Sequence, residues 1–127
     1  MEERNKSRKY DLEERLIDYS VLISELVEKL PNNKLCIYLG GQIIRSGVSP
    51  ALNYGEAQSA ESSNDFIHKL KIFLKELRET NICLKILLRK SYPKLNDLIL
   101  NSLSETNELI SIFVKSIQTS KKKLTYK

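Results

Sequence analysis

The sequence predicts an all-α protein that forms one antiparallel, up-down-up-down four-helix bundle. The chain has 127 residues, enough for one hydrophobic core without disulfides or a structural metal. It contains four glycines, three prolines and no tryptophan, whereas β-sheet and α/β folds need more turn residues. Long windows carry apolar residues three and four positions apart, the spacing of one helix face.

The first two predicted helices are separated by the turn at residues 31–33. The first covers residues 11–30 and begins at Asp11, a good N-cap residue. The second covers about residues 34–61 and contains Pro50. Because proline removes one backbone hydrogen bond and crowds the preceding turn, we expect either a kink or a short break there.

The last two predicted helices cover residues 64–90 and 94–119, and they are joined by a short Ser-Tyr-Pro turn. Short loops favour antiparallel neighbours in a bundle. The predicted organisation is a basic N-terminal arm, a four-helix bundle and a basic, frayed C-terminal tail, at residues 1–10, 11–119 and 120–127.

The net charge of +5 is concentrated at the two ends of the chain. Residues 1–10 carry +2 and residues 115–127 carry +5, while the span between them carries −2. Basic ends attract phosphate-rich partners, although they also serve as a solubility device.

No apolar stretch approaches the ~18 residues of a membrane span, and the charged N-terminus has no secretory signal pattern. We therefore expect a cytoplasmic protein that does not contact membranes. In that compartment, Cys36 and Cys83 are expected to be reduced core thiols rather than a disulfide.

The reactive side chains do not group into a catalytic or metal-binding pattern. A di-iron site in a bundle needs a Glu-x-x-His pair on each of two helices, and His68 is the one histidine of the chain. Gly40-Gly41 lacks the lysine of a phosphate-binding loop, and neither cysteine has a histidine base in its sequence context. We expect no enzymatic activity, no cofactor and no metal.

The second predicted helix is apolar on two sides, whereas one bundle core uses one side. Its first apolar stripe suits the core of the bundle. Its second stripe lies about 100° around the helix and is interpreted as an oligomer interface, the alternative being the wide flank of a single core. This second stripe contains Ile37, Gly40, Ile44, Val48, Ala51 and Gly55.

A third, polar stripe on the same helix predicts a structural cluster. Arg45 can pair with Glu56, or with Glu76 and Glu79 of the third helix. Ser49 and Asn53 can take up backbone groups that Pro50 releases. The predicted cluster contains Arg45, Ser49, Asn53, Glu56 and Glu76, and a binding cleft is the alternative.

The third predicted helix carries a row of cations, and this row indicates nucleic-acid binding. Its cations fall within about 80° of one another at 100° per residue, well away from the core seam. The alternative is a solvated face softened by the pairs Asp65–Lys69 and Lys75–Glu79. The candidate phosphate-binding residues are Lys71, Lys75, Arg78, Lys85 and Arg89 on this helix and Lys121, Lys122 and Lys123 in the tail.

The segments YDLEERLIDYS and IIRSGVSPALNYGEAQSAESSNDFIHKLKIFLKELRET resemble the four-helix bundle proteins related to the 23S rRNA intervening-sequence protein. The resemblance covers about residues 10–92. Gly47 and Val48 stand where that family often has alanine or serine. The most specific matches are Arg45-Ser46, Ser49, Asn53, Glu56, Asp65-Phe66 and Glu76.

This resemblance implies an up-down bundle that assembles as a ring-shaped homopentamer. It also implies kinship with the accessory variability protein of diversity-generating retroelements, a basic pentameric barrel that binds nucleic acid and a reverse transcriptase. Two hypotheses follow. The first is a non-catalytic homo-oligomer that binds structured RNA or DNA, as an accessory to another enzyme. The second is an oligomeric scaffold that binds proteins.

Overall fold

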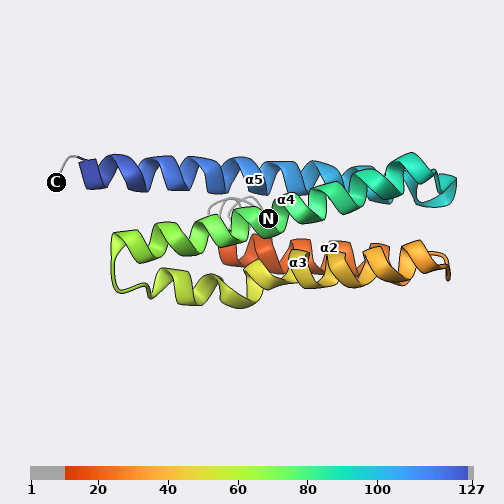
Figure 1. The fold of residues 1–127 in the computed structure, drawn as a ribbon, viewed down its shortest axis with the longest axis horizontal. Helices are drawn as coiled ribbons and strands as arrows, with labels where there is room; N and C mark the ends of the chain where they lie inside the picture. Colours follow the sequence, from red (N-terminus) through yellow and green to blue (C-terminus); the bar gives the residue numbers. More distant parts are fainter. Residues whose placement is uncertain (1–10, 126–127) are drawn as a thin grey trace, which may run out of the picture.

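The computed structural model describes residues 11–125, which form four long α-helices. Successive helices run antiparallel and pack side by side, and α2 closes the bundle against α5 less extensively (Figure 1). The predicted all-α antiparallel bundle is therefore confirmed. The basic arm at 1–10 and the last two residues of the tail lie outside the described residues. The elements are α2 (Leu12–Glu28), α3 (Lys34–Gln58), α4 (Ser63–Lys90), the short 3-10 helix η1 (Pro93–Leu95) and α5 (Asn96–Thr125).

Polar side chains cap the first three helices at their N-termini. Each accepts a hydrogen bond from a backbone N–H that has no partner within its helix, which stabilises the first turn. Asp11 accepts from the backbone N–H of Glu14, with an N–O distance of 3.2 Å. Asn33 accepts in the same way from Cys36 at 2.9 Å, and Ser62 accepts from Asp65 at 3.1 Å.

The two largest differences between predicted and observed helix boundaries are at the ends of α3 and α5. α3 continues through Pro50 without a break and ends at Gln58, three residues before the predicted end. α5 continues to Thr125, so residues 120–125 of the predicted frayed tail are helical. Leu124 is partly buried and packs against the hydrophobic core, which stabilises this last part of α5.

A layer of four hydroxyl side chains crosses the core. Each helix contributes one side chain to it: Tyr19, Ser46, Thr80 and Thr106, all of them buried. The Tyr19 hydroxyl lies 2.7 Å from Thr106 Oγ1, and Ser46 Oγ lies 2.6 Å from Thr80 Oγ1. Burial raises the pKa of Tyr19 to about 12, although hydrogen bonds to Thr106 and Thr80 oppose this rise. Because a buried hydroxyl needs a partner, the layer fixes the register of the four helices.

Gly47 allows α2 and α3 to approach closely beside this layer. A Cβ atom at this position would lie 2.1 Å from Cδ1 of Ile23, well inside van der Waals contact. Ile23 is itself fully buried, so its side chain has little room to move. The glycine therefore serves helix packing, and the helix continues through it.

We expect Thr80→Val and Ser46→Ala each to lower the free energy of unfolding by about 1 kcal/mol, since each removes one partner of a buried hydrogen bond. The double variant should lose less than the sum of the two, because no hydroxyl of the pair is then left without its partner. Urea unfolding of the four proteins measures this coupling. Strictly additive losses would show that the two hydroxyls do not act as a pair.

The stability of the fold should fall at alkaline pH through Tyr19. The folded-state pKa of about 12 lies above the unfolded value of 10.0, so this contribution is complete below pH 10 and is lost as the pH rises towards 12. By pH ~11.5 the loss from Tyr19 is about 2 kcal/mol, and Tyr19→Phe should lose correspondingly less stability than the wild type. Urea unfolding of the wild type and of Tyr19→Phe, at neutral pH and at pH ~11.5, checks the prediction. Equal losses of unfolding free energy in the two proteins would contradict it.

Candidate nucleic-acid interface

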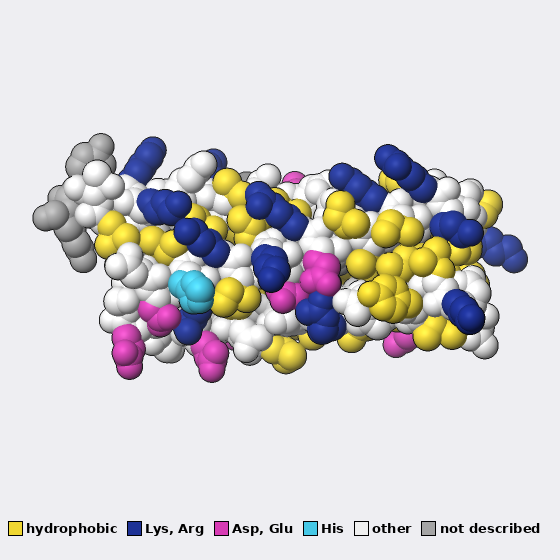
Figure 2. Space-filling model, in the orientation of Figure 1, with side chains coloured by type: hydrophobic (Ala, Val, Ile, Leu, Met, Phe, Trp, Pro, Cys, Tyr) yellow, Lys and Arg dark blue, Asp and Glu magenta, His cyan; other side chains and the backbone are white. Residues whose placement is uncertain are grey.

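Four of the predicted cations surround one groove between α4 and α5. Lys71, Lys75 and Arg78 line it from α4, and Lys121 lines it from α5, around a volume of about 540 Å³. All four side chains are exposed, and Figure 2 shows Lys and Arg side chains along this part of the surface. The helical extension of α5 places Lys121 opposite the α4 row, which the sequence prediction of a frayed tail did not foresee.

The floor of the groove is apolar and its lining contains no carboxylate. Leu74, Val114 and Ile117 form the floor, and Gln118 adds one neutral polar group. Within residues 11–125, none of the four cations makes an ion pair. The aliphatic stems of lysine and arginine can therefore lie along the apolar floor while the charged groups remain in water.

The carboxylates of α4 are paired on other sides of the helix. Asp65 pairs with Lys69 at 3.4 Å. Glu76 and Glu79 both pair with Arg45 of α3, so the alternative pair Lys75–Glu79 does not form. The positive field of the α4 row is consequently less neutralised than the sequence alone suggested.

The other predicted cations lie apart from the groove. Lys85 and Arg89 follow Arg78 by two and three helical turns and neighbour the exposed Ile82 and Ile86. Lys122 is exposed on the final turns of α5. The structure therefore divides the eight predicted residues into a groove set of four, an α4 pair and an α5 pair.

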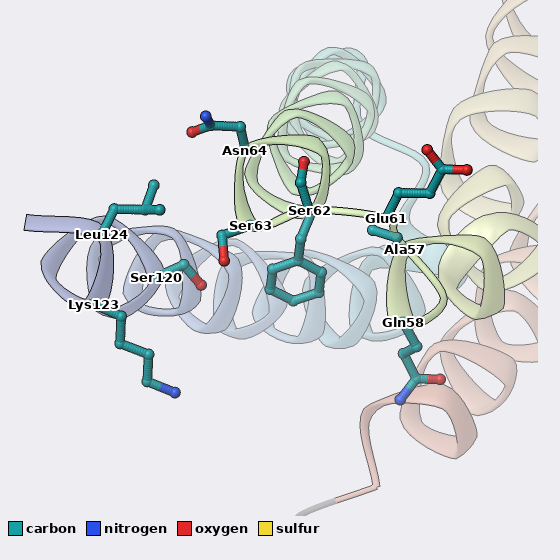
Figure 3. A pocket seen from close by; sticks show the side chains of 11 residues that line it. Ala57, Gln58, Glu61, Ser62, Ser63, Asn64, Ser120, Lys123 and Leu124 are labelled. Atoms are coloured by element: carbon teal, nitrogen blue, oxygen red, sulfur yellow. The ribbon is translucent and has the colours of Figure 1, made fainter. Parts of the chain in front are cut away.

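Lys123 borders a second hollow, of about 670 Å³, at the turn between α3 and α4. Figure 3 shows its side chain extending away from Ser63 and Asn64, which lie at the start of α4. Glu61 contributes a carboxylate to the same lining. This hollow has mixed charge and does not extend the basic groove.

Only part of the predicted polar cluster meets at Arg45. Its guanidinium lies 3.2 Å from Glu76, also contacts Glu79, and donates to Gln42 at 3.1 Å. The hydrogen bond with Glu79, opposed in part by desolvation, raises the pKa of Arg45 above its ordinary value. Glu56 is exposed and takes no part in an ion pair with Arg45.

Ser49 and Asn53 form a separate local contact one turn further along α3. The Asn53 amide donates to the Ser49 carbonyl at 3.0 Å and to its hydroxyl at 3.2 Å. The carbonyl that Pro50 leaves without a helical partner is that of Ser46, four residues before it. Asn53 therefore reinforces the turn after the proline and does not satisfy the released group.

The predicted interface stripe of α3 does not form one continuous surface. Ile37 and Ile44 are exposed, at 63% and 37%. Gly40 is instead buried, with a Cβ position 3.2 Å from Val27, and Val48 and Ala51 pack partly against the core. Because α3 packs on both α2 and α4, much of its second apolar side is used within the subunit.

Reactive groups are dispersed over the part of the chain that the structure describes. Both cysteines are buried and free, and burial raises the pKa of Cys83. Cys36 donates from its sulfur to the Tyr92 hydroxyl at 3.3 Å. Residues 11–125 contain no group of three or more His, Cys, Asp or Glu that could hold a metal ion. None of their helices has the length and apolar character needed to cross a bilayer.

Comparison with known proteins places the fold and the sequence in one family. The family model of the 23S rRNA-intervening sequence protein matches residues 8–116. The crystal structure of a protein of unknown function from Bacteroides thetaiotaomicron, of the S23 ribosomal protein family, is similar at 31% identity and a TM-score of 0.74. The match covers 83% of this chain and 96% of that one. No curated protein matches the chain. This chain therefore belongs to the 23S rRNA-intervening sequence protein family.

Proposed function

We propose that this protein is a non-catalytic homo-oligomer that binds structured RNA or DNA through the groove between α4 and α5. The observation that carries the proposal is the meeting of Lys71, Lys75, Arg78 and Lys121 at one groove whose lining has no carboxylate. Cations held on two packed helices can contact phosphates without being reorganised first. Such binding is steeply dependent on salt and largely independent of sequence.

The spacing of these cations suits a phosphate backbone. Lys71, Lys75 and Arg78 span about 10 Å along α4, since each residue adds about 1.5 Å to a helix. Lys121 stands across the groove from them. A set of this size neutralises several neighbouring phosphates in each subunit.

Assembly would multiply the affinity of a weak site. When copies bind the same nucleic acid, the second contact is intramolecular and proceeds at a high effective concentration. The family resemblance suggests a ring of five copies, and an accessory role beside a reverse transcriptase or another nucleic-acid enzyme. In this proposal the protein contributes binding surface and the partner contributes catalysis.

A second candidate function, an oligomeric scaffold that binds proteins, draws support from exposed apolar side chains. Ile37, Tyr38, Ile82 and Ile86 are between 39% and 64% exposed. Figure 2 shows hydrophobic atoms gathered where α3 begins and α4 ends, away from the groove. Patches of this kind mark protein contact sites more often than nucleic-acid sites.

We expect the variant Lys75→Gln/Arg78→Gln to bind a structured RNA hairpin and a DNA duplex about tenfold or more weakly at low salt. The slope of log K against log salt should become shallower by about 1.8 on duplex DNA, because two phosphate contacts are lost. Fluorescence polarisation titrations at several salt concentrations measure both quantities.

Arg45→Gln is the control, since it removes a positive charge from a guanidinium that is already paired with Glu76 and Glu79, whereas the double variant removes two charges from the groove. Its affinity should stay close to that of the wild type. If the wild-type protein binds neither nucleic acid at low salt, the proposal fails and the scaffold function is favoured. If Arg45→Gln weakens binding as much as the double variant, the groove is not the site.

A further inference from the structure

Charge is divided between two helices that lie diagonally opposite each other. Both α2 and α4 pack on α3 and on α5, so their outer faces point away from each other. α2 carries one cation, Arg15, and five carboxylates. The carboxylates are Glu13, Glu14, Asp18, Glu25 and Glu28. α4 carries seven cations and three carboxylates, and those carboxylates are paired with Lys69 or Arg45. One side of the subunit is therefore acidic and the opposite side basic.

The outer side of α2 combines carboxylates with two exposed apolar side chains. Ile17 and Val21 are 44% and 52% exposed. At 100° per residue, they fall within about 80° of three exposed glutamates, directly opposite the buried seam. We name this surface the acidic face, and it consists of Glu14, Ile17, Val21, Glu25 and Glu28.

The distal part of α4 has the complementary character. Ile82 and Ile86 are 55% and 39% exposed, and Lys85 and Arg89 flank them. These four residues form what we name the basic face, which lies beyond the groove that holds Lys71, Lys75 and Arg78 (Figure 2). In both faces the apolar pair is four residues apart, about 6 Å along the helix.

We infer that the acidic face of one copy docks on the basic face of a second copy. The two apolar pairs bury each other, and the glutamates beside Val21 meet Lys85 and Arg89 at the rim. Opposite charge at the rim sets the orientation, while the apolar centre supplies most of the affinity. This inference rests on the oligomeric part of the proposed function and assigns the contact to α2 and α4 in place of the α3 stripe.

The contact is heterologous, because the two surfaces that meet are different. Every copy keeps one free face of each kind, so association continues beyond a dimer until the assembly closes into a ring or grows as a filament. An isologous dimer, by contrast, would leave no free face. The groove residues Lys71, Lys75, Arg78 and Lys121 are outside the contact and stay available to phosphates.

The test uses two variants, each with one face blocked. Val21→Lys places a cation against the basic face, and Ile82→Glu places a carboxylate against the acidic face. We expect the wild type to be larger than a dimer in analytical ultracentrifugation and each variant alone to be a monomer. An equimolar mixture of the two variants should associate, since the intact acidic face of one then meets the intact basic face of the other.

Leu52→Glu is the control, because Leu52 is 78% exposed but lies on the second half of α3, outside both faces. It should leave the assembly unchanged. Circular dichroism and urea unfolding verify that every variant is folded. A monomeric wild type, folded single variants that remain assembled, or a mixture of folded monomeric variants that does not associate would each overturn the inference. So would dissociation by Leu52→Glu alone.

Failure of the inference and failure of the proposed function are separable. Polarisation titrations with the RNA hairpin report the groove, and ultracentrifugation without nucleic acid reports the faces. If the protein assembles through α2 and α4 but does not bind nucleic acid, the inference stands and the nucleic-acid proposal falls. If the variants are monomeric and bind the hairpin more weakly than the wild type but measurably, both stand.

Discussion

The hydroxyl layer of Tyr19, Ser46, Thr80 and Thr106 is the constraint on which the rest of the structure depends. Apolar side chains tolerate small shifts of one helix along another, but buried hydroxyls lose their partners when the helices shift. The layer therefore fixes the axial position of α4 against α3. That position decides which carboxylates Arg45 can reach, and Gly47 permits the close approach of α2 beside it.

The register of the bundle has an electrostatic consequence on its surface. Arg45 engages Glu76 and Glu79, and Asp65 engages Lys69, so the carboxylates of α4 are paired away from the groove. On the other side, Arg15 of α2 pairs with Glu105 and Glu108 of α5, which leaves the outer side of α2 predominantly acidic. The two polar clusters thus shape the charge that each side of the subunit presents.

The proposed phosphate-binding groove and the proposed contact between copies use different parts of α4. The groove set lies against α5, whose last turns bring Lys121 to it. Lys85 and Arg89 lie further along α4, beside exposed isoleucines that a phosphate backbone does not use. A ring or filament built through that second part would present many grooves along one assembly, which suits weak contacts that gain strength by repetition.

The sequence by itself determined the all-α class, the four helices and the N-cap at Asp11, because apolar spacing and capping chemistry are local signals. It also identified the α4 cations, since their angular spacing follows from helix geometry alone. Only the tertiary structure decided the partners of Arg45, the burial of Gly40 and the helical path of residues 120–125. These depend on which side chains distant segments bring together, and the period of a single helix carries no information about its neighbours.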